Sequence, residues 1–192
     1  MKTIVREGPL KILEVLYKKE SYLREIARKA DLNPNSTYRY LNEMLKEDIV
    51  KARKEGNQKR FSLKKNDFVY NLMAYIDIKK FQKLPEIRKQ AINNYIQNLN
   101  TKPVFVILFG STAKNTFNQD SDIDLLLVVN KKTNTKEAKK EVEAIQSLKI
   151  NDFQIDYNVF LREIKLKEDK VIQSAINTGY PVYNQIEYHK HE

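Results

Sequence analysis

Apolar residues in the first third of the chain recur at helical spacing. One such stretch covers residues 9–17, and two more follow candidate N-cap residues at Ser21 and Asn33. Residues 49–63 instead form two short strand-like pieces joined by a turn at 55–58. The pattern predicts three helices followed by a β-hairpin.

Residues 66–99 form a second stretch of helical pattern, which is broken at Pro85. Apolar positions repeat at helical spacing on both sides of the break, which predicts two helices. These positions are Phe68, Leu72, Tyr75 and Ile76 before the break, and Ile87, Ala91, Tyr95 and Leu99 after it. The segment is too short and too charged to be a membrane span.

Beyond residue 100 the pattern changes to short apolar runs that alternate with polar loops and helical stretches. This mixture predicts strands and helices in one domain. Predicted strands cover 104–109, 123–129 and 153–160, predicted helices cover 135–148 and 163–177, and the tail after Thr178 suggests a short closing strand.

Two acidic residues open the second apolar run, and a third lies in the last predicted strand. Asp122 and Asp124 are two residues apart, so on a strand their side chains share one face. In the stretch 153–160 the apolar side chains take one face, which leaves Asp156 on the other and free to join the pair if the strands are neighbours. Three carboxylates held together repel one another unless a cation lies between them, and an all-oxygen set suits magnesium.

Gly110-Ser111 ends the first apolar run, and ten residues lie between Ser111 and Asp122. Glycine lets backbone approach a ligand closely, and helix N–H groups with the Ser111 hydroxyl can bind phosphate oxygens. A calcium loop is a competing interpretation, but it fails because Leu125 and Lys131 stand where a glycine and an acid are needed. A solvated acidic turn also competes, since acids cluster in turns for local reasons.

Taken together, these residues resemble the DNA polymerase β nucleotidyltransferase superfamily, in particular its minimal prokaryotic branch, over roughly residues 85–186. The resemblance implies a small mixed sheet with packed helices, two Mg²⁺ ions and a nucleoside triphosphate substrate. Asp122 and Asp124 would ligate both ions, and Asp156 would ligate one and help to deprotonate the attacking hydroxyl. The residues expected to bind the nucleotide are Gly110, Ser111 and Lys114.

One short segment departs from the family pattern. Relatives usually carry Ala-Arg-Gly after the Gly-Ser pair, where this chain has Ala113-Lys114-Asn115. Lys114 keeps the positive charge without the bidentate fork of arginine. Asn115 is, after glycine, among the residues most tolerant of a left-handed backbone. The departure weakens the resemblance, but no acid is lost.

The three helices and hairpin of the first third resemble a winged helix-turn-helix domain over roughly residues 5–64. The resemblance implies binding to double-stranded DNA, with the helix from Pro34 entering the major groove and the hairpin lying along a phosphate backbone or minor groove. The expected DNA-binding residues are Asn35, Ser36, Arg39, Asn42, Arg53, Lys54, Lys59 and Arg60. Residues 1–65 carry 17 Lys and Arg against 9 acids, so +8 of the net charge of +10 lies there. A helical domain that is merely soluble, or binds proteins, is the competing interpretation.

The predicted organisation belongs to the α+β class. It has a winged helix-turn-helix domain at 1–65, a helical linker at 66–99, and a nucleotidyltransferase-fold domain, a mixed sheet with flanking helices, at 100–192. Two interpretations of the linker remain open. Both helices pack on the neighbouring domains, or the first forms the seam of a homodimer, as winged-helix proteins often bind two half-sites.

Composition limits the classes of function. The chain has no cysteine, which excludes disulfides, thiolate metal sites and cysteine nucleophiles. Its start lacks the long apolar stretch of a signal peptide, so the cytoplasm is the expected compartment.

Three hypotheses about function follow. The first is a DNA-binding nucleotidyltransferase that moves a nucleoside monophosphate from an NTP to a hydroxyl acceptor. Minimal relatives are often paired with small helical HEPN-type toxins, so the resemblance also implies a HEPN-type partner and an autoregulatory antitoxin role. The second is a transcription regulator whose nucleotidyltransferase-like domain binds a nucleotide or a partner without turnover. The third is a transferase that acts on nucleic acid.

Overall fold

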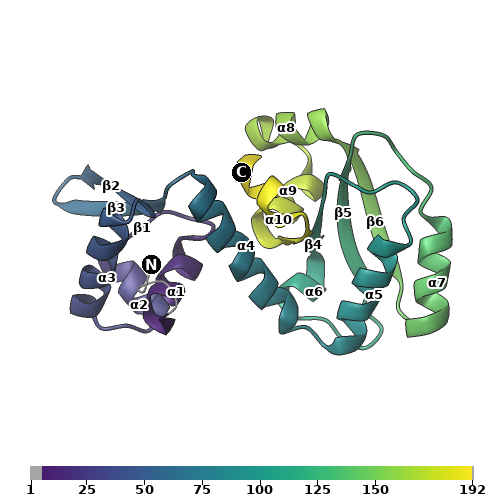
Figure 1. Cartoon of the computed structure of the whole chain (residues 1–192), viewed down its shortest axis with the longest axis horizontal. Coiled ribbons are helices and arrows are strands. Elements are labelled where there is room, and N and C mark those ends of the chain that lie inside the picture. The colour runs from purple at the N-terminus through teal and green to yellow at the C-terminus, as the bar shows by residue number, and fades with distance from the viewer. Residues whose placement is uncertain (1–5, 192) are drawn as a thin grey trace. The chain divides into compact units, whose positions relative to one another are not determined.

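The computed structural model describes residues 6–191. The chain divides into two compact units between Met73 and Ala74, and helix α4 (Asp67–Gln82) carries the chain across this boundary (Figure 1). Within residues 6–191, no helix is both long and apolar enough to cross a bilayer.

The N-terminal unit has the predicted order of three helices and a hairpin, with one additional short strand. Its three antiparallel strands follow the order β1-β3-β2. This arrangement is a winged helix-turn-helix fold, in which β2 and β3 form the wing (Figure 1). The elements are α1 (Glu7–Leu16), β1 (Ser21–Tyr22), α2 (Leu23–Ala30), α3 (Pro34–Lys46), β2 (Val50–Glu55) and β3 (Gln58–Leu63).

The two predicted N-caps of this unit have different outcomes. The Asn33 side chain accepts a hydrogen bond of 2.8 Å from the backbone N–H of Asn35, so the predicted cap of α3 is confirmed. Ser21 was the wrong cap for α2, which begins at Leu23 after Tyr22. Ser21 instead belongs to β1, because pairing with β3 uses its extended backbone.

The C-terminal unit is built on a four-stranded mixed sheet, as the sequence predicts. The strand order is β6-β5-β4-β7, in which β5 and β6 are parallel and the other pairs are antiparallel. The elements after α4 are α5 (Glu86–Gln97), β4 (Phe105–Phe109), α6 (Gly110–Lys114), β5 (Ile123–Val129), α7 (Lys136–Gln146), β6 (Ile150–Asp156), α8 (Tyr157–Leu166), α9 (Lys170–Thr178), β7 (Tyr180–Tyr183) and α10 (Gln185–His191).

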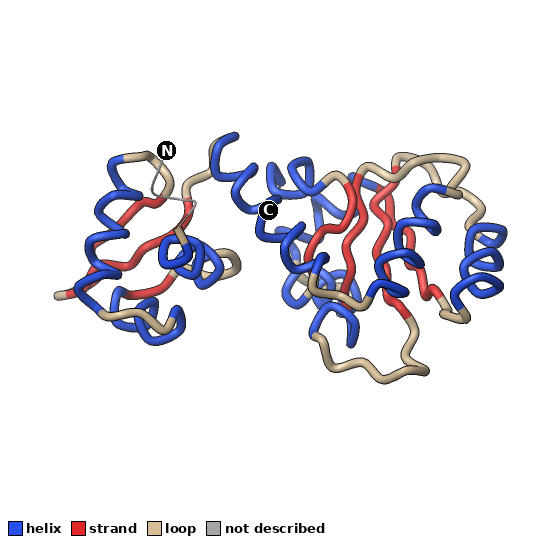
Figure 2. The backbone as a smooth tube through the Cα atoms, turned by 60° about the horizontal axis from the view of Figure 1, so that its bottom comes forward, coloured by secondary structure: helices blue, strands red, loops and turns tan. Residues whose placement is uncertain are grey.

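Both faces of this sheet are covered by helices, which makes three layers (Figure 2). Alternate side chains of β4 and β5 enter two separate apolar clusters, because successive residues of a strand face opposite sides. One cluster joins Val106, Leu108, Leu125 and Leu127 to helices α5 and α7 through residues such as Tyr95 and Val142. The other joins Phe105, Ile107, Leu126 and Val128 to helices α8, α9 and α10 through Phe160, Ile172 and Tyr188.

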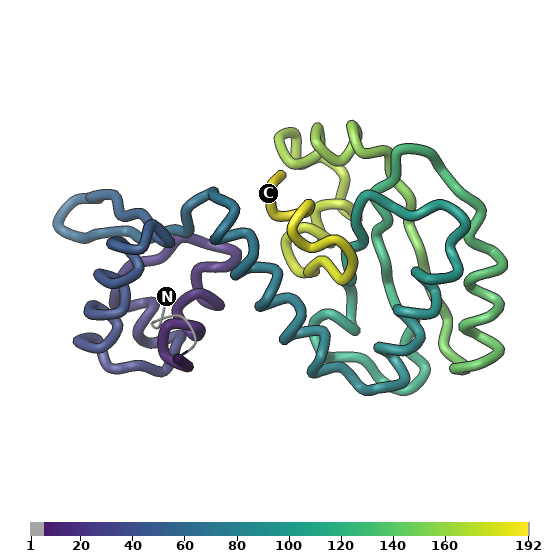
Figure 3. Tube along the Cα trace, viewed as in Figure 1, coloured from purple at the N-terminus to yellow at the C-terminus, as the bar shows by residue number. Residues whose placement is uncertain are grey.

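The boundary between the two compact units, between Met73 and Ala74, falls inside the predicted helical linker at 66–99. Helix α5 packs against the sheet of the C-terminal unit, where Ala91 and Tyr95 are fully buried (Figure 3). On α4, Phe68 and Tyr75 are 40% and 51% exposed. A homodimer seam along α4 stays a prediction.

The third predicted strand is wrong in its extent. Strand β6 covers Ile150–Asp156, earlier than the expected 153–160, and the chain turns into α8 at Tyr157. The Asp156 side chain caps this helix by accepting a 2.8 Å hydrogen bond from the N–H of Asn158. The apolar alternation continued past the strand because α8 buries Phe160 with its own helical period.

Candidate functional site

Gly110 and Asp124 are held against each other where β4 ends. Phe109, the last residue of β4, lies opposite Asp124 in the antiparallel register with β5. Gly110 has a φ of +69°, and a Cβ atom added there would lie 2.0 Å from Asp124 Oδ2. Only glycine fits this position, so the Asp124 carboxylate lies directly over the backbone of the Gly-Ser turn.

The second acid, Asp122, is exposed and stands one residue before β5 begins. Ser111 is the second residue of α6, half-buried, and Lys114 is its last residue, exposed. Asn115 has a φ of +56°, the left-handed backbone that the sequence suggested it could tolerate. The structure therefore gathers the Gly-Ser turn and two of the three predicted acids at the beginning of β5.

Asp156 does not join this pair, which corrects the prediction of a three-acid site. In the parallel register between β5 and β6, Asp156 lies opposite Val129, at the far end of β5 from Asp124. Val129 is five positions from Asp124 along the strand, a distance of about 16 Å at roughly 3.3 Å per residue. The carboxylate of Asp156 is also engaged in capping α8.

Asn151 takes the place that the third acid was expected to fill. It lies opposite Asp124 in the parallel register, and its Nδ2 donates a 3.0 Å hydrogen bond to Asp124 Oδ1. The register of two parallel strands is set by packing over the whole sheet, so the sequence alone gave no indication that position 151 would face the acids.

The donor set fits one hard cation better than the two expected magnesium ions. Within residues 6–191, no group of three or more acidic, histidine or cysteine side chains is placed to hold a metal ion. Asp122 and Asp124 supply carboxylate oxygens, which suit Mg²⁺ completed by phosphates and water. The amide nitrogen that Asn151 turns towards Asp124 is a donor and cannot ligate a metal in that orientation.

Asp152, the acid that follows Asn151 on β6, faces the other side of the sheet. Its side chain is only 4% exposed and forms an ion pair with Lys139 of α7. The Tyr95 hydroxyl donates a 2.5 Å hydrogen bond to its Oδ2. Burial alone would raise the pKa of the Asp152 carboxyl, but hydrogen bonds from Lys139, Tyr95 and Thr135 outweigh it and hold the pKa below the ordinary value of 3.8. Asp152 therefore fastens α5 and α7 to β6.

Replacing Asp152 should destabilise the C-terminal unit in a pH-dependent way. We expect Asp152→Asn to lower the free energy of unfolding at pH 7 by about 2 kcal/mol, because Lys139 and the Tyr95 hydroxyl lose a charged partner. A carboxyl with a lowered folded-state pKa stabilises above its unfolded pKa, so the difference from wild type should vanish as the pH falls below about 4. Urea unfolding at pH 7 and pH 3 measures this, with Glu141→Gln, an exposed acid of α7, as control. An equal loss at both pH values would contradict the role given to the charge.

Arg88 of α5 is a second feature that the sequence analysis missed. It is only 2% exposed, and its guanidinium bonds Thr112 of α6 and the loop before β5. Burial lowers the pKa of the Arg88 guanidinium below its ordinary value. A signal was available, because position 88 shares the helical stripe of Ala91 and Tyr95, where a charged residue is unexpected.

The predicted major-groove helix α3 exposes two of its four candidate residues to solvent. Asn35 and Arg39 are exposed, while Ser36 and Asn42 are half-buried. The opposite side of the helix is buried through Thr37, Leu41 and Met44. The placement is compatible with the predicted DNA contacts, which stay predictions.

The wing has two kinds of basic residue. Lys54 and Lys59 lie opposite each other next to its tip. Both are exposed, and neither forms an ion pair with any residue in the described part of the chain. Gly56 forms the turn between them with a φ of +58°. These two lysines remain available for phosphates.

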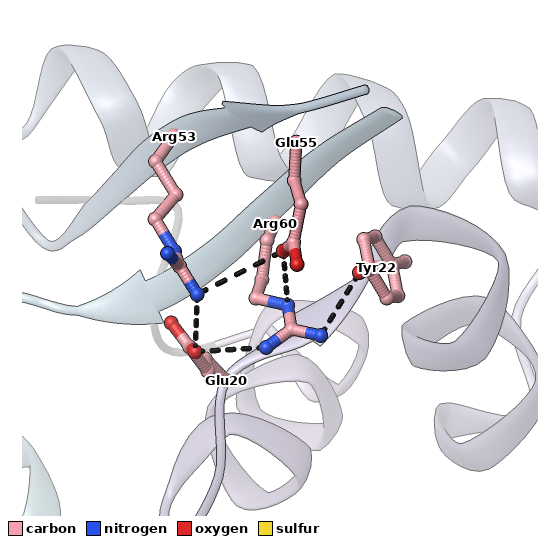
Figure 4. A network of polar contacts seen from close by, with 5 residues as sticks. All are labelled: Glu20, Tyr22, Arg53, Glu55 and Arg60. Atoms are coloured by element: carbon pink, nitrogen blue, oxygen red, sulfur yellow. Dashed lines mark hydrogen bonds and ion pairs between the residues drawn. The ribbon is translucent and has the colours of Figure 1, made fainter. Parts of the chain in front are cut away.

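The two wing arginines, in contrast, are engaged within the protein (Figure 4). Glu20 Oε1 lies 2.9 Å from Arg53 and 3.0 Å from Arg60. Arg60 also contacts Glu55 at 2.9 Å and donates a 2.9 Å hydrogen bond to the Tyr22 hydroxyl. The hydrogen bond from Arg60 lowers the pKa of the Glu20 carboxyl. Arg60 therefore ties the wing to β1, while Arg53 is still 60% exposed, and the DNA contacts expected of both arginines stay predictions.

A groove of about 460 Å³ separates the wing from helices α2 and α3. Tyr38, which is 53% exposed, and Arg24 line it on the helical side, and Lys59 lines it on the wing side. Tyr38 and Arg24 were absent from the predicted interface because a single helical face was assigned without knowing where the wing would lie.

Comparison with known proteins covers both units. A family model described as polymerase beta, nucleotidyltransferase matches residues 90–188, over half of the 192-residue chain. None of the curated proteins matches the chain.

Several solved structures resemble part of the chain. One is a homodimeric winged helix-turn-helix DNA-binding domain from Mycobacterium bovis, 23% identical over 40% of this chain and 70% of that chain, with a TM-score of 0.36. Another is the transcriptional regulator HlyU from Vibrio vulnificus, 22% identical over 40% of this chain and 80% of that chain, with a TM-score of 0.37. At these scores the winged-helix assignment rests on the strand order and helices of the N-terminal unit itself. Because the family match spans more than half of its length, the chain belongs to the polymerase β nucleotidyltransferase family.

Proposed function

We propose that this protein is a DNA-binding regulator whose nucleotidyltransferase domain binds a magnesium nucleotide without turning it over. The observation that carries the proposal is the side chain next to Asp124, which is the amide of Asn151 and not a third carboxylate. An amide can neither accept the proton of an attacking hydroxyl nor add negative charge to a metal site.

The geometry supports nucleotide binding by the remaining residues. Asp122 and Asp124 can share one cation. The Asp124 carboxylate lies directly against the Gly110 backbone, where no side chain at position 110 would fit. The cation would offset the charge of the phosphates when bound. Ser111 and Lys114, on the helix that follows Gly110, are the proposed phosphate contacts from the protein.

A nucleotidyltransferase with activity on a hydroxyl acceptor is the second candidate. The intact pair of Asp122 and Asp124, held beside Gly110, favours it, since this is the part of the motif that contacts the nucleotide in the family. The antitoxin role, the HEPN-type partner and the cytoplasmic location remain predictions from the sequence.

Binding and transfer can be separated with one set of reagents. The purified protein is titrated with each magnesium NTP by calorimetry, and then incubated with the α-phosphate-labelled NTP, alone and with cell lysate. The proposal expects binding that Asp124→Asn removes, and no transfer of label. Label transfer by wild type that is lost in Asp122→Asn would establish the transferase instead. No binding of any NTP would leave DNA binding as the remaining function.

The wing lysines should account for part of the DNA affinity. We expect Lys54→Ala with Lys59→Ala to weaken binding to a fluorescent duplex about tenfold at low salt, and to reduce the slope of log K against log[salt] by about 2, since each phosphate contact contributes roughly 0.9. Lys131→Ala with Lys132→Ala, two exposed lysines of the other unit, is the matched control. An unchanged slope in the wing variant would show that these two lysines do not contact DNA phosphates.

A further inference from the structure

Arg88 makes contacts on both sides of the nucleotide site from a buried position on α5. Its Nη1 donates a 2.9 Å hydrogen bond to Thr112 Oγ1, on the helix that begins with Gly110. Its Nη2 donates to the carbonyl oxygens of Asn118 at 2.9 Å and Ser121 at 3.0 Å. Ser121 immediately precedes Asp122, so one guanidinium links the two segments that carry the candidate ligands.

The loop that Arg88 holds is closed by its own hydrogen bonds. The N–H of Asn118 donates to Ser121 Oγ at 2.9 Å, and the Ser121 hydroxyl donates to Asn118 Oδ1 at 2.9 Å. The N–H of Asp120 also donates to Asn118 Oδ1, at 3.1 Å. Residues 118–121 therefore form a compact turn, and Arg88 attaches this turn to the rest of the domain.

The contacts require the shape of arginine in particular. The Arg88 guanidinium carbon lies 4.2 Å from the centroid of the Phe117 ring, so the planar group stacks while its edges donate hydrogen bonds. A lysine at this position has one ammonium and no plane, so it cannot stack and also reach Thr112 and both carbonyl oxygens. Nothing in the described chain places an acid against Arg88, whose acceptors are a hydroxyl and two carbonyl oxygens.

We propose that Arg88 is the positioning residue of the nucleotide site, which fixes Asp122 relative to Gly110 and Asp124 by anchoring the 116–122 loop to α6. The inference deepens the proposed nucleotide site and rests on it. Arg88 itself does not contact the ligand. Its effect is to keep Asp122 in place, which would otherwise lie at the end of an exposed loop.

The test compares Arg88→Lys with Tyr95→Phe, a variant of the same helix that loses a hydrogen bond to Asp152 on the opposite face of the sheet from Asp124. Three quantities are measured for each: the melting temperature, the Kd for MgATP and for Mn²⁺ at a temperature where both variants are folded, and amide hydrogen exchange of residues 116–122. We expect Arg88→Lys to raise both Kd values about tenfold, as loss of a supporting contact does at other metal sites. Exchange in the loop should become at least about tenfold faster. Tyr95→Phe should lower the melting temperature without either effect.

The outcomes distinguish the inference from the proposed function. Wild-type affinity and slow loop exchange in Arg88→Lys would overturn the positioning role, whatever the melting temperature does. Equal weakening of affinity in Tyr95→Phe would also overturn it, because general destabilisation would then explain the loss. If wild type binds neither MgATP nor Mn²⁺, the proposed function fails, and the exchange of residues 116–122 alone decides whether Arg88 holds the loop.

Discussion

Asn151→Asp should tighten divalent cation binding by about ten- to a hundredfold, the largest gain expected from any single change in this protein. The new carboxylate would stand where Asn151 now donates a hydrogen bond to Asp124. A third charged oxygen ligand raises the affinity of a hard-cation site. Without metal, the same charge should lower the free energy of unfolding by about 1 kcal/mol, because two carboxylates then face each other at a solvated site. If the missing acid is what limits turnover, label transfer from an NTP should also appear.

The measurements are Mn²⁺ titration, and unfolding in EDTA and in excess Mg²⁺. Asn158→Asp is a matched control, because it adds the same charge at the other end of β6, beside Asp156 and away from Asp124. We expect the control to leave Mn²⁺ affinity unchanged. Equal affinity in wild type and Asn151→Asp would contradict the assignment of position 151 to the metal site.

Gly110→Ala should abolish nucleotide binding and destabilise the C-terminal unit by at least about 3 kcal/mol. Two effects combine at this position. A left-handed backbone disfavours any residue with a Cβ atom by about 1 kcal/mol, and here that atom would also lie 2.0 Å from Asp124 Oδ2. Relieving the overlap requires the Asp124 carboxylate to move, which removes a proposed ligand of the cation.

Gly56→Ala separates the two effects. Gly56 has nearly the same backbone, with a φ of +58°, but no atom lies within 4 Å of its added Cβ. We expect it to destabilise by only about 1 kcal/mol and to leave MgATP affinity unchanged. Calorimetric melting and nucleotide titration of both variants give the comparison. If Gly110→Ala were as stable as Gly56→Ala and had normal nucleotide affinity, the expectation would be contradicted. The Asp124 carboxylate could then move away from the new Cβ atom without loss of binding.

The local elements of this fold could be predicted from the sequence because their signals are local. The Asn33 cap, the hairpin turn at Gly56 and the strand 123–129 each follow from a few neighbouring residues, and all three are found. The motif of Gly110-Ser111 and Asp122-x-Asp124 also has a fixed spacing, although the close approach of Gly110 to Asp124 is seen only in the structure. The family could be recognised from the sequence because its motif has this fixed spacing.

The composition of the metal site could not be predicted in the same way. Which residue of β6 lies beside Asp124 depends on how two parallel strands are aligned by the helix between them, and no short pattern encodes that. Asp156 was predicted because it is an acid on an alternating stretch, but Asn151, five positions earlier, is the residue that lies beside Asp124. The wing posed a similar problem, because charge alone does not distinguish an exposed lysine without an ion pair, such as Lys59, from an arginine that pairs with Glu20.

The packing of α5 determines where a C-terminal fragment of this protein can begin. A fragment starting at residue 100, where the sequence pattern first changes, would lack Ala91, Ile92 and Tyr95, which cover one side of the sheet. Such a truncated product would present bare β4 and β5 side chains to water, and inclusion bodies are the expected outcome on expression. It would also lack Arg88. Cloning of a separate C-terminal half should therefore begin upstream of Leu84, the first residue of that cluster.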